Sequence, residues 1–246
     1  MRRARLFVVG VAAAASLAAC REHTVDIEFA PRRGDQFDYR YTVRATLTRA
    51  VDGGEPEVQT VDTVLLAHQE VLGRRGQGTR IEIDLTRDGG ARSTVVAIVD
   101  RAGSLEGIEL VQGLDAEVFG IGEDGGFVTD PADGIPDRPL RPGERWSISD
   151  GARRGTGELV RLGVEDGRDV AVVRTSTDEL LEIEGGDGRI RAGSRTSYDL
   201  VDGAVRSSRS WSHGVVDAEV EPPPDVAAEP VQARIRYDVE VEVERR

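Results

Sequence analysis

The sequence has a single cysteine, Cys20, in its 246 residues. A disulfide within the chain is therefore excluded, and the fold must be stabilised by packing alone. Aromatic residues make up only 4% of the chain and methionine occurs once. The hydrophobic core must therefore be built mainly from valine, isoleucine, leucine and alanine. Lysine is absent, so that arginine supplies the basic residues other than histidine.

The chain is also poor in positive charge. Its formal net charge is −13, and the segment before Cys20 contains three arginines and no acid, which leaves −16 on the 227 residues from Cys20 onward. A strongly acidic protein has no electrostatic attraction for nucleic acid or for anionic lipid headgroups. The charge therefore argues against nucleic acid as a partner and against a basic membrane-binding patch.

Long apolar runs are missing except at the N-terminus. Arg2, Arg3 and Arg5 precede an apolar run from Leu6 to Ala19. This run is shorter than the roughly 18–20 residues needed to span a bilayer. A positive start, a short apolar run and small residues at its end are typical of a secretory signal peptide. We therefore predict that residues 1–19 are a signal peptide.

The end of this segment, Leu17, Ala18, Ala19 and Cys20, resembles the lipobox of bacterial lipoproteins. The resemblance implies that Cys20 is lipidated through its sulfur, becomes the new N-terminus and anchors the chain to a membrane. Two or more acyl chains hold a protein firmly. We therefore expect a membrane-anchored, extracytoplasmic protein of the cell envelope. Because Arg21 follows Cys20, the inner-membrane retention signal with aspartate is absent. This favours the outer membrane in a host with two membranes, and otherwise the outer face of the plasma membrane.

After a short tether, residues 20–26, the sequence alternates between apolar and polar residues. Phe37, Tyr39, Tyr41, Val43, Ala45 and Leu47 share one face of a predicted strand, and the odd-numbered positions of 231–243 share one face of another. Period-two alternation is typical of a strand with one buried face. Similar patterns occupy 58–71, 81–85, 94–99, 105–111, 159–164, 170–177, 190–200 and 205–211. Turn signals rich in Asp and Gly, such as Asp166-Gly167 and Asp202-Gly203, separate several of these runs.

These patterns predict an all-β protein with a curved antiparallel meander of about ten to twelve strands. The sheet is expected to form a half-barrel or a barrel-like structure, with few or no helices in the mature domain. We predict one β-rich domain over 27–246, with two strand-rich halves joined by the Gly-, Pro- and Asp-rich loop 120–143. Only 112–119 and 178–184 are candidates for helices, and both are short. The Pro-rich stretch 221–230 is expected to be a loop.

Two segments resemble a family of uncharacterised bacterial lipoproteins. Residues 29–41 are similar to the F-x-P-x-x-G-x-x-[FY]-x-Y entry to that family's first strand, and residues 134–146 resemble its mid-chain L-P-x-x-P-V-x-x-G-x-x-W motif. The family implies no activity. Its sheet is similar to the half-barrel of periplasmic lipoprotein carriers and of mycobacterial lipid-carrying lipoproteins, which hold acyl chains on the concave face. Such carriers cover the cavity with helices, which this chain almost lacks. We interpret Trp146 as a core anchor.

Metal and cofactor sites are not predicted. An acidic loop contains Asp124, Asp130, Asp133 and Asp137, and part of it echoes calcium-binding repeats. The register of acidic positions fails upstream, so we interpret this loop as a solvated turn. The three histidines, at 23, 68 and 213, lack the spacing of a zinc site and have no supporting cysteine.

A catalytic motif is also missing. The sequence has no G-x-S-x-G, and the two serines that precede His213, Ser210 and Ser212, point to the face opposite the histidine in a strand. Pairs of carboxylates carry no information in a chain with 45 acidic residues. We therefore expect a protein that is not an enzyme, with a hydrolase as the remote alternative.

Two hypotheses remain open. The first is a binding module whose concave apolar face accepts a lipid or another apolar ligand. The second is a structural or protein-interaction module of the envelope with a filled core. Scarcity of helices favours an uncovered face that a ligand fills, whereas scarcity of aromatics favours a closed aliphatic core. The candidate ligand face consists of Tyr39, Tyr41, Val43, Tyr237, Val239 and Val241.

Overall fold

A computed structural model of the chain describes residues 24–51, 54–87, 90–112, 134–183, 185–220 and 231–246. The predicted signal peptide, the lipobox with Leu17, Ala18 and Ala19, and Cys20 lie outside the described residues. So do residues 120–133 of the predicted connecting loop and the Pro-rich stretch 221–230. The structure therefore does not test these predictions.

The described residues form eleven strands and no helix. This confirms the predicted all-β class. The strands are β1 (Gln36–Val51), β2 (Glu57–Arg75), β3 (Gly78–Arg87), β4 (Arg92–Val99), β5 (Leu105–Gln112), β6 (Arg145–Asp150), β7 (Arg153–Glu165), β8 (Arg168–Ile183), β9 (Gly186–Asp199), β10 (Val205–Val220) and β11 (Val231–Arg245).

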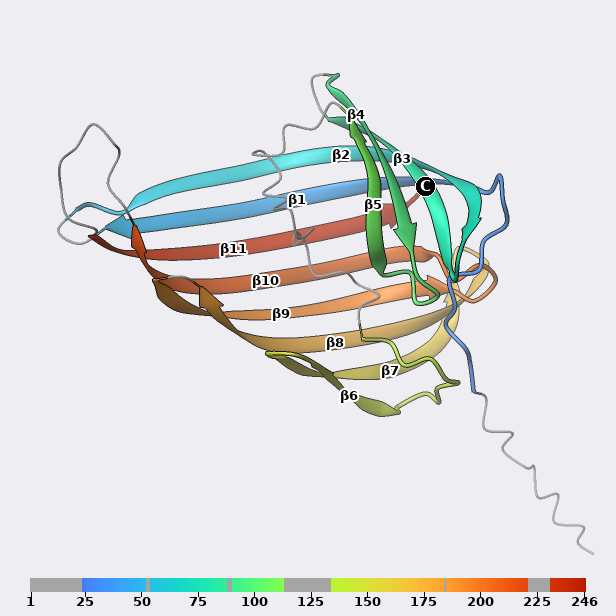
Figure 1. Cartoon of the computed structure of the whole chain (residues 1–246). Coiled ribbons are helices and arrows are strands. Elements are labelled where there is room, and N and C mark those ends of the chain that lie inside the picture. Colours follow the sequence, from blue (N-terminus) through green and yellow to red (C-terminus); the bar gives the residue numbers. More distant parts are fainter. Residues whose placement is uncertain (1–23, 52–53, 88–89, 113–133, 184, 221–230) are drawn as a thin grey trace, which may run out of the picture.

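All eleven strands belong to one antiparallel sheet with the order β5-β4-β3-β2-β1-β11-β10-β9-β8-β7-β6. Each half of the chain is a meander, and the two meanders join where the first strand pairs with the last, for example Val43 with Val241. The sheet does not close, because β5 and β6 are its two edges. Figure 1 shows its strong curvature, with the steeply inclined β3, β4 and β5 crossing in front of the long strands.

The turns explain part of this topology. Asp166 and Gly167 both have positive φ, at 50° and 76°, as a tight two-residue hairpin between β7 and β8 requires. In β2 the pairing with β3 shifts between Val71 and Gly73, where Gly73 has a φ of 139°. A bulge of this kind bends a strand and increases its twist. The bend lies next to the point where β3 begins to cross over the sheet.

One secondary-structure prediction is wrong. Residues 178–183 are not helical but form the end of β8, which pairs with β9 as far as Ile183 and Gly186. Cross-strand contacts favour the strand, since Asp178 accepts hydrogen bonds from Arg189 on β9. The other helix candidate, 112–119, lies almost wholly outside the described residues.

The buried residues form two clusters. One includes Phe37, Tyr39, Ala97 and Val243, and so joins β1 and β11 to the overlying β4. The second contains Trp146, whose indole nitrogen donates a hydrogen bond to the Gly134 carbonyl at 2.6 Å. The prediction that Trp146 anchors the core is therefore confirmed.

Candidate ligand-binding cavity

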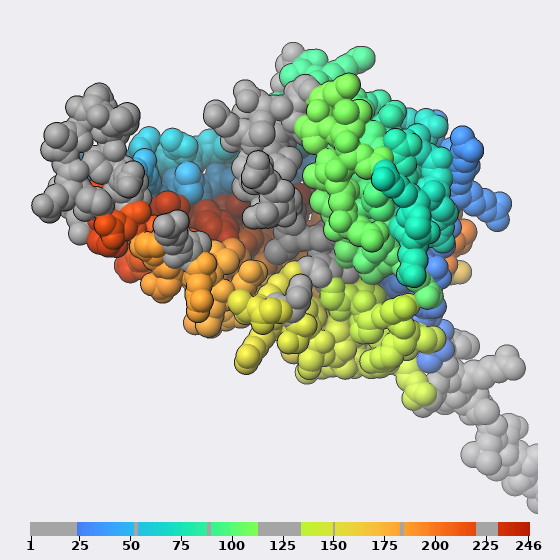
Figure 2. All heavy atoms as spheres, in the orientation of Figure 1, coloured from blue at the N-terminus to red at the C-terminus, as the bar shows by residue number. Residues whose placement is uncertain are grey.

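A cavity of about 500 Å³ lies between the curled part of the sheet and its central strands. Its floor is the inner face of β1 and β11, with contributions from β9 and β10, and its other walls come from β2 to β5. The space-filling view shows β3 to β5 (green) standing over the sheet at this place (Figure 2). Strands thus cover this part of the inner face, where the predicted carrier-like fold would use helices.

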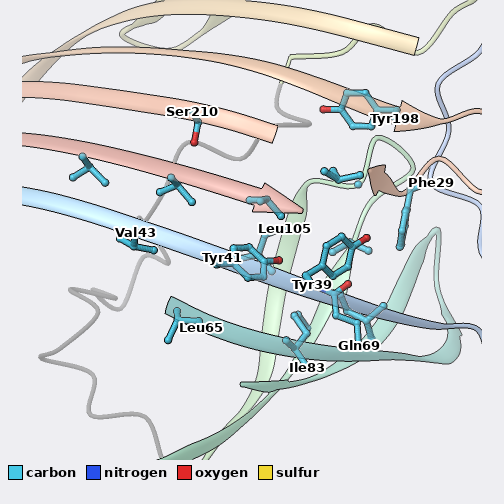
Figure 3. A pocket seen from close by; sticks show the side chains of 18 of the residues that line it. Phe29, Tyr39, Tyr41, Val43, Leu65, Gln69, Ile83, Leu105, Tyr198 and Ser210 are labelled. Carbon is cyan, nitrogen blue, oxygen red and sulfur yellow. The ribbon is translucent and has the colours of Figure 1, made fainter. Parts of the chain in front are cut away.

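The walls are almost entirely apolar. Valine, isoleucine, leucine, alanine, phenylalanine and tyrosine supply most of the surface, and Arg87 is the one charged residue among the described residues that line the cavity. Figure 3 shows Tyr39, Tyr41 and Val43 from β1 facing into the space, together with Leu65 and Ile83 from the neighbouring strands. The polar lining residues other than tyrosine are Arg87, Thr63, Gln69 and Ser210.

One end of the cavity is closed by the segment that precedes β1. The Phe29 amide donates to the Arg101 carbonyl at 2.7 Å, and the Ala30 amide donates to the Asp202 carbonyl at 3.0 Å. These bonds hold the segment between the β4–β5 turn and the β9–β10 turn. Gly203 has a φ of 70°, and a Cβ there would lie 1.9 Å from the Glu28 carbonyl oxygen, so the close approach requires glycine.

The closure is reinforced by charge. Arg101 forms salt bridges with Asp26 at 2.9 Å, Glu28 at 3.1 Å and Asp137 at 2.9 Å. One guanidinium therefore connects the N-terminal segment, the β4–β5 turn and the loop before β6. Phe29, which lines the cavity from this segment, is only 8% exposed.

The opposite end is open to solvent. Val61 on β2 is 47% exposed, although it lines the cavity. Arg87, at the last position of β3, is exposed as well. The cavity therefore has a buried apolar end and a wet end that carries its cation.

Aromatic side chains run from the closed end along β1. Ring centroids are 6.4 Å apart for Phe29 and Phe37, 6.5 Å for Phe37 and Tyr39, and 6.1 Å for Tyr39 and Tyr41. Burial, followed by the neighbouring Tyr41, raises the pKa of the Tyr39 phenol well above its usual range. Tyr39 therefore stays neutral at physiological pH, and the cavity wall it forms carries no negative charge.

Five of the six residues predicted for the ligand face line this cavity: Tyr39, Tyr41, Val43, Val239 and Val241. Tyr237 is not among the lining residues. It lies on the same face of β11 but packs over Gly214, where a Cβ would come within 2.1 Å of its ring. Burial raises the pKa of Tyr237 too, and a hydrogen bond with Ser212 opposes this effect.

Sequence reasoning did not identify the walls that come from β2 to β5. The alternation of these strands is visible in the sequence. Which strands face each other across the cavity depends on how the sheet curls, and the sequence pattern does not show this. The lining residues on these strands are Val61, Thr63, Leu65, Gln69, Ile81, Ile83, Arg87, Ala97, Val99 and Leu105.

The histidine candidates of the sequence lie away from the cavity. His68 is 2.8 Å from Asp38 and His213 is 2.6 Å from Asp238, each as a cross-strand pair. Ser210 faces the cavity, on the side of β10 opposite to His213 (Figure 3). The described part of the chain holds no group of three or more potential metal ligands.

Of the four acidic residues of this loop, only Asp137 is described, and it pairs with Arg101 at 2.9 Å. Its side chain is 76% exposed. Asp124, Asp130 and Asp133 lie outside the described residues. The part of the chain that the structure describes contains no helix able to cross a membrane.

No protein-family model matches the chain, and no curated protein matches its sequence. Two solved structures align weakly with it. One is a loop L8 deletion mutant of OmpT, an outer membrane protein of Vibrio cholerae, with 8% identity over 85% of this chain and 99% of that chain and a TM-score of 0.22. The other is a LolA superfamily protein from Nitrosomonas europaea, with 8% identity over 84% of this chain and 86% of that chain and a TM-score of 0.13. Neither score supports an inference about function, and the resemblance to uncharacterised lipoproteins stays a prediction.

Proposed function

We propose that this protein is a non-catalytic binding module of the cell envelope that holds a lipid or another apolar ligand in the cavity under β3 to β5. The observation that carries the proposal is an apolar cavity of about 500 Å³ with one closed and one open end. Ligand pockets commonly have volumes of about 300–1,000 Å³ and mostly apolar walls with a few polar groups.

The free energy of burial favours a ligand in this cavity. Removing apolar surface from water contributes roughly 25 cal/mol per Å². The walls are mostly apolar and one end is open to water, so an apolar ligand that covers them gains free energy by removing this surface from water.

The membrane anchor through Cys20 belongs to the same proposal. It rests on the lipobox resemblance of residues 17–20 and on the short apolar run before it. An anchored chain with an apolar cavity would keep its ligand site close to a source of lipids. We carry forward the filled-core envelope module as the alternative that the binding experiment must separate.

The experiment compares three variants for uptake of an apolar fluorescent probe and for stability. Tyr41→Ala and Val239→Ala remove cavity walls, so the proposal expects weaker probe uptake with folding retained. Val164→Ala is a matched control, because Val164 is 64% exposed and does not line the cavity. If the wall variants lose about 1–5 kcal/mol of stability and the wild type takes up no probe, the filled-core alternative holds.

A further inference from the structure

We infer that the cavity takes an amphiphile with an acidic headgroup, with the acyl chain in the apolar interior and the acid at Arg87. The inference rests on the proposed function and adds the ligand class. It follows from the position of the one cation on a wall that is otherwise apolar or uncharged.

The cavity is polarised along its length. Its closed end is formed by buried groups such as Phe29, at 8% exposure, and Tyr198, at 1%. Its open end has Val61, at 47% exposure, and the exposed Arg87. A ligand that matches this gradient has an apolar tail for the closed end and a hydrated head for the open end.

Arg87 is placed to receive that head. It pairs with Leu65 across the β2–β3 ladder, and it shares the cavity face of β3 with Ile81 and Ile83. The apolar stem of arginine can lie along such a wall while its guanidinium stays in water. Among the residues that the structure describes, Arg87 forms no ion pair.

The chemistry of the guanidinium selects an acid. Its planar fork binds a carboxylate or a phosphate through two parallel hydrogen bonds, and charge assistance strengthens both. A cationic headgroup would be repelled at the same place. The net charge of −13 opposes anions at long range, but salt screens that field over about 8 Å. A hydrogen-bonded contact between the acidic headgroup and the Arg87 guanidinium is shorter than this distance, so salt screens it much less than the long-range repulsion.

The test uses the full chain with Cys20→Ala, so that any acyl chain present is bound noncovalently. Displacement of an apolar fluorescent probe gives the Kd of laurate, dodecyl phosphate and dodecanol, which share one chain length. Each is measured with wild-type cavity residues, with Arg87→Gln and with Arg92→Gln. Arg92 is the matched control, since it pairs with Thr86 and lines a separate hollow, together with Asp84 and Thr94, on the opposite face of the sheet.

The inference expects Arg87→Gln to weaken binding of at least one acid by about tenfold or more, as loss of a charge-assisted hydrogen bond implies. Dodecanol binding and the Arg92→Gln variant should change by less than about twofold. A loss confined to laurate assigns a fatty acid, a loss confined to dodecyl phosphate assigns a phosphate-bearing lipid, and a loss for both assigns their shared acidic chemistry.

Other results would overturn the inference that Arg87 binds an acidic headgroup. If Arg87→Gln leaves both acids unchanged, or weakens dodecanol equally, the headgroup assignment is wrong while the binding function stands. If none of the amphiphiles binds to the protein with an intact cavity, the proposed function fails together with the inference.

Discussion

Replacing Ser210 with leucine distinguishes a ligand cavity from a filled core. Ser210 is 4% exposed and lies on the cavity wall, with its side chain directed into the space (Figure 3). Its neighbours in register are Ser194 on β9 and Val241 on β11. The longer leucine side chain must extend into the cavity, because the strand backbone lies behind it.

The sign of the stability change is the informative quantity. Each apolar carbon group that leaves water contributes about 0.8 kcal/mol, which gives about 2 kcal/mol for this change. Restricting the leucine side chain to one rotamer reduces this gain in stability by about 0.5–1 kcal/mol. In a hollow site the variant should therefore be more stable than wild type by about 1–2 kcal/mol. In a filled core the same change overpacks the site and costs about 1–3 kcal/mol.

The assay combines urea unfolding with uptake of an apolar fluorescent probe. We expect a higher urea midpoint with an unchanged slope, and weaker uptake because leucine occupies part of the site. Ser208→Leu is the matched control on the same face of β10: Ser208 is 6% exposed, its hydroxyl lies 2.8 Å from that of Thr196, and it does not line the cavity. That variant should be destabilised. Equal destabilisation of both variants with unchanged uptake would refute the reasoning.

Three further predictions concern the anchor and two titrating groups. Cys20→Ala should move the protein from the membrane to the soluble fraction on cell fractionation, and continued membrane association would contradict the lipid anchor. Because burial raises the pKa of Tyr39, its contribution to stability is complete below the ordinary phenol value of about 10 and is lost as the pH rises further. Tyr39→Phe should therefore reduce the alkaline loss of stability in urea unfolding; an unchanged loss would exclude Tyr39 as its source. The hydrogen bond from Arg234 lowers the pKa of Asp217, so its contribution is present above the ordinary value of about 4 and is lost as the pH falls. Asp217→Asn should flatten this acid-side loss, and a pH profile identical to that of wild type would count against the pair.

The sequence was sufficient to predict ten of the eleven strands and their faces, because successive side chains along a strand point to opposite sides; β6 (Arg145–Asp150) was not among the predicted runs. Alternation along β1 placed Tyr39, Tyr41 and Val43 on one face, as the structure has them. It could not predict how far along a strand the cavity extends, and so it included Tyr237, which packs over Gly214 instead. The helix candidate 178–184 failed because local pattern does not include the cross-strand pairing with β9.

Arg87 shows the limit of local pattern more clearly. In the sequence it belongs to the turn signal Arg87-Asp88-Gly89-Gly90, and turn residues are usually solvated. Its place at the cavity depends on the curl that carries β3 over β1 and β11. That curl results from long-range pairing and from bulges such as the one between Val71 and Gly73. Neither can be derived from neighbouring residues alone.

Mass spectrometry of a lipid extract tests the binding function most directly. The sample is the full chain with Cys20→Ala, purified from the soluble fraction without detergent, and it is compared with the same chain carrying Ser210→Leu. We predict an equimolar, noncovalently bound amphiphile in the first sample and a reduced amount in the second. A clean extract from the first sample, together with no uptake of an apolar probe, would contradict the binding function and favour an envelope module with a filled core.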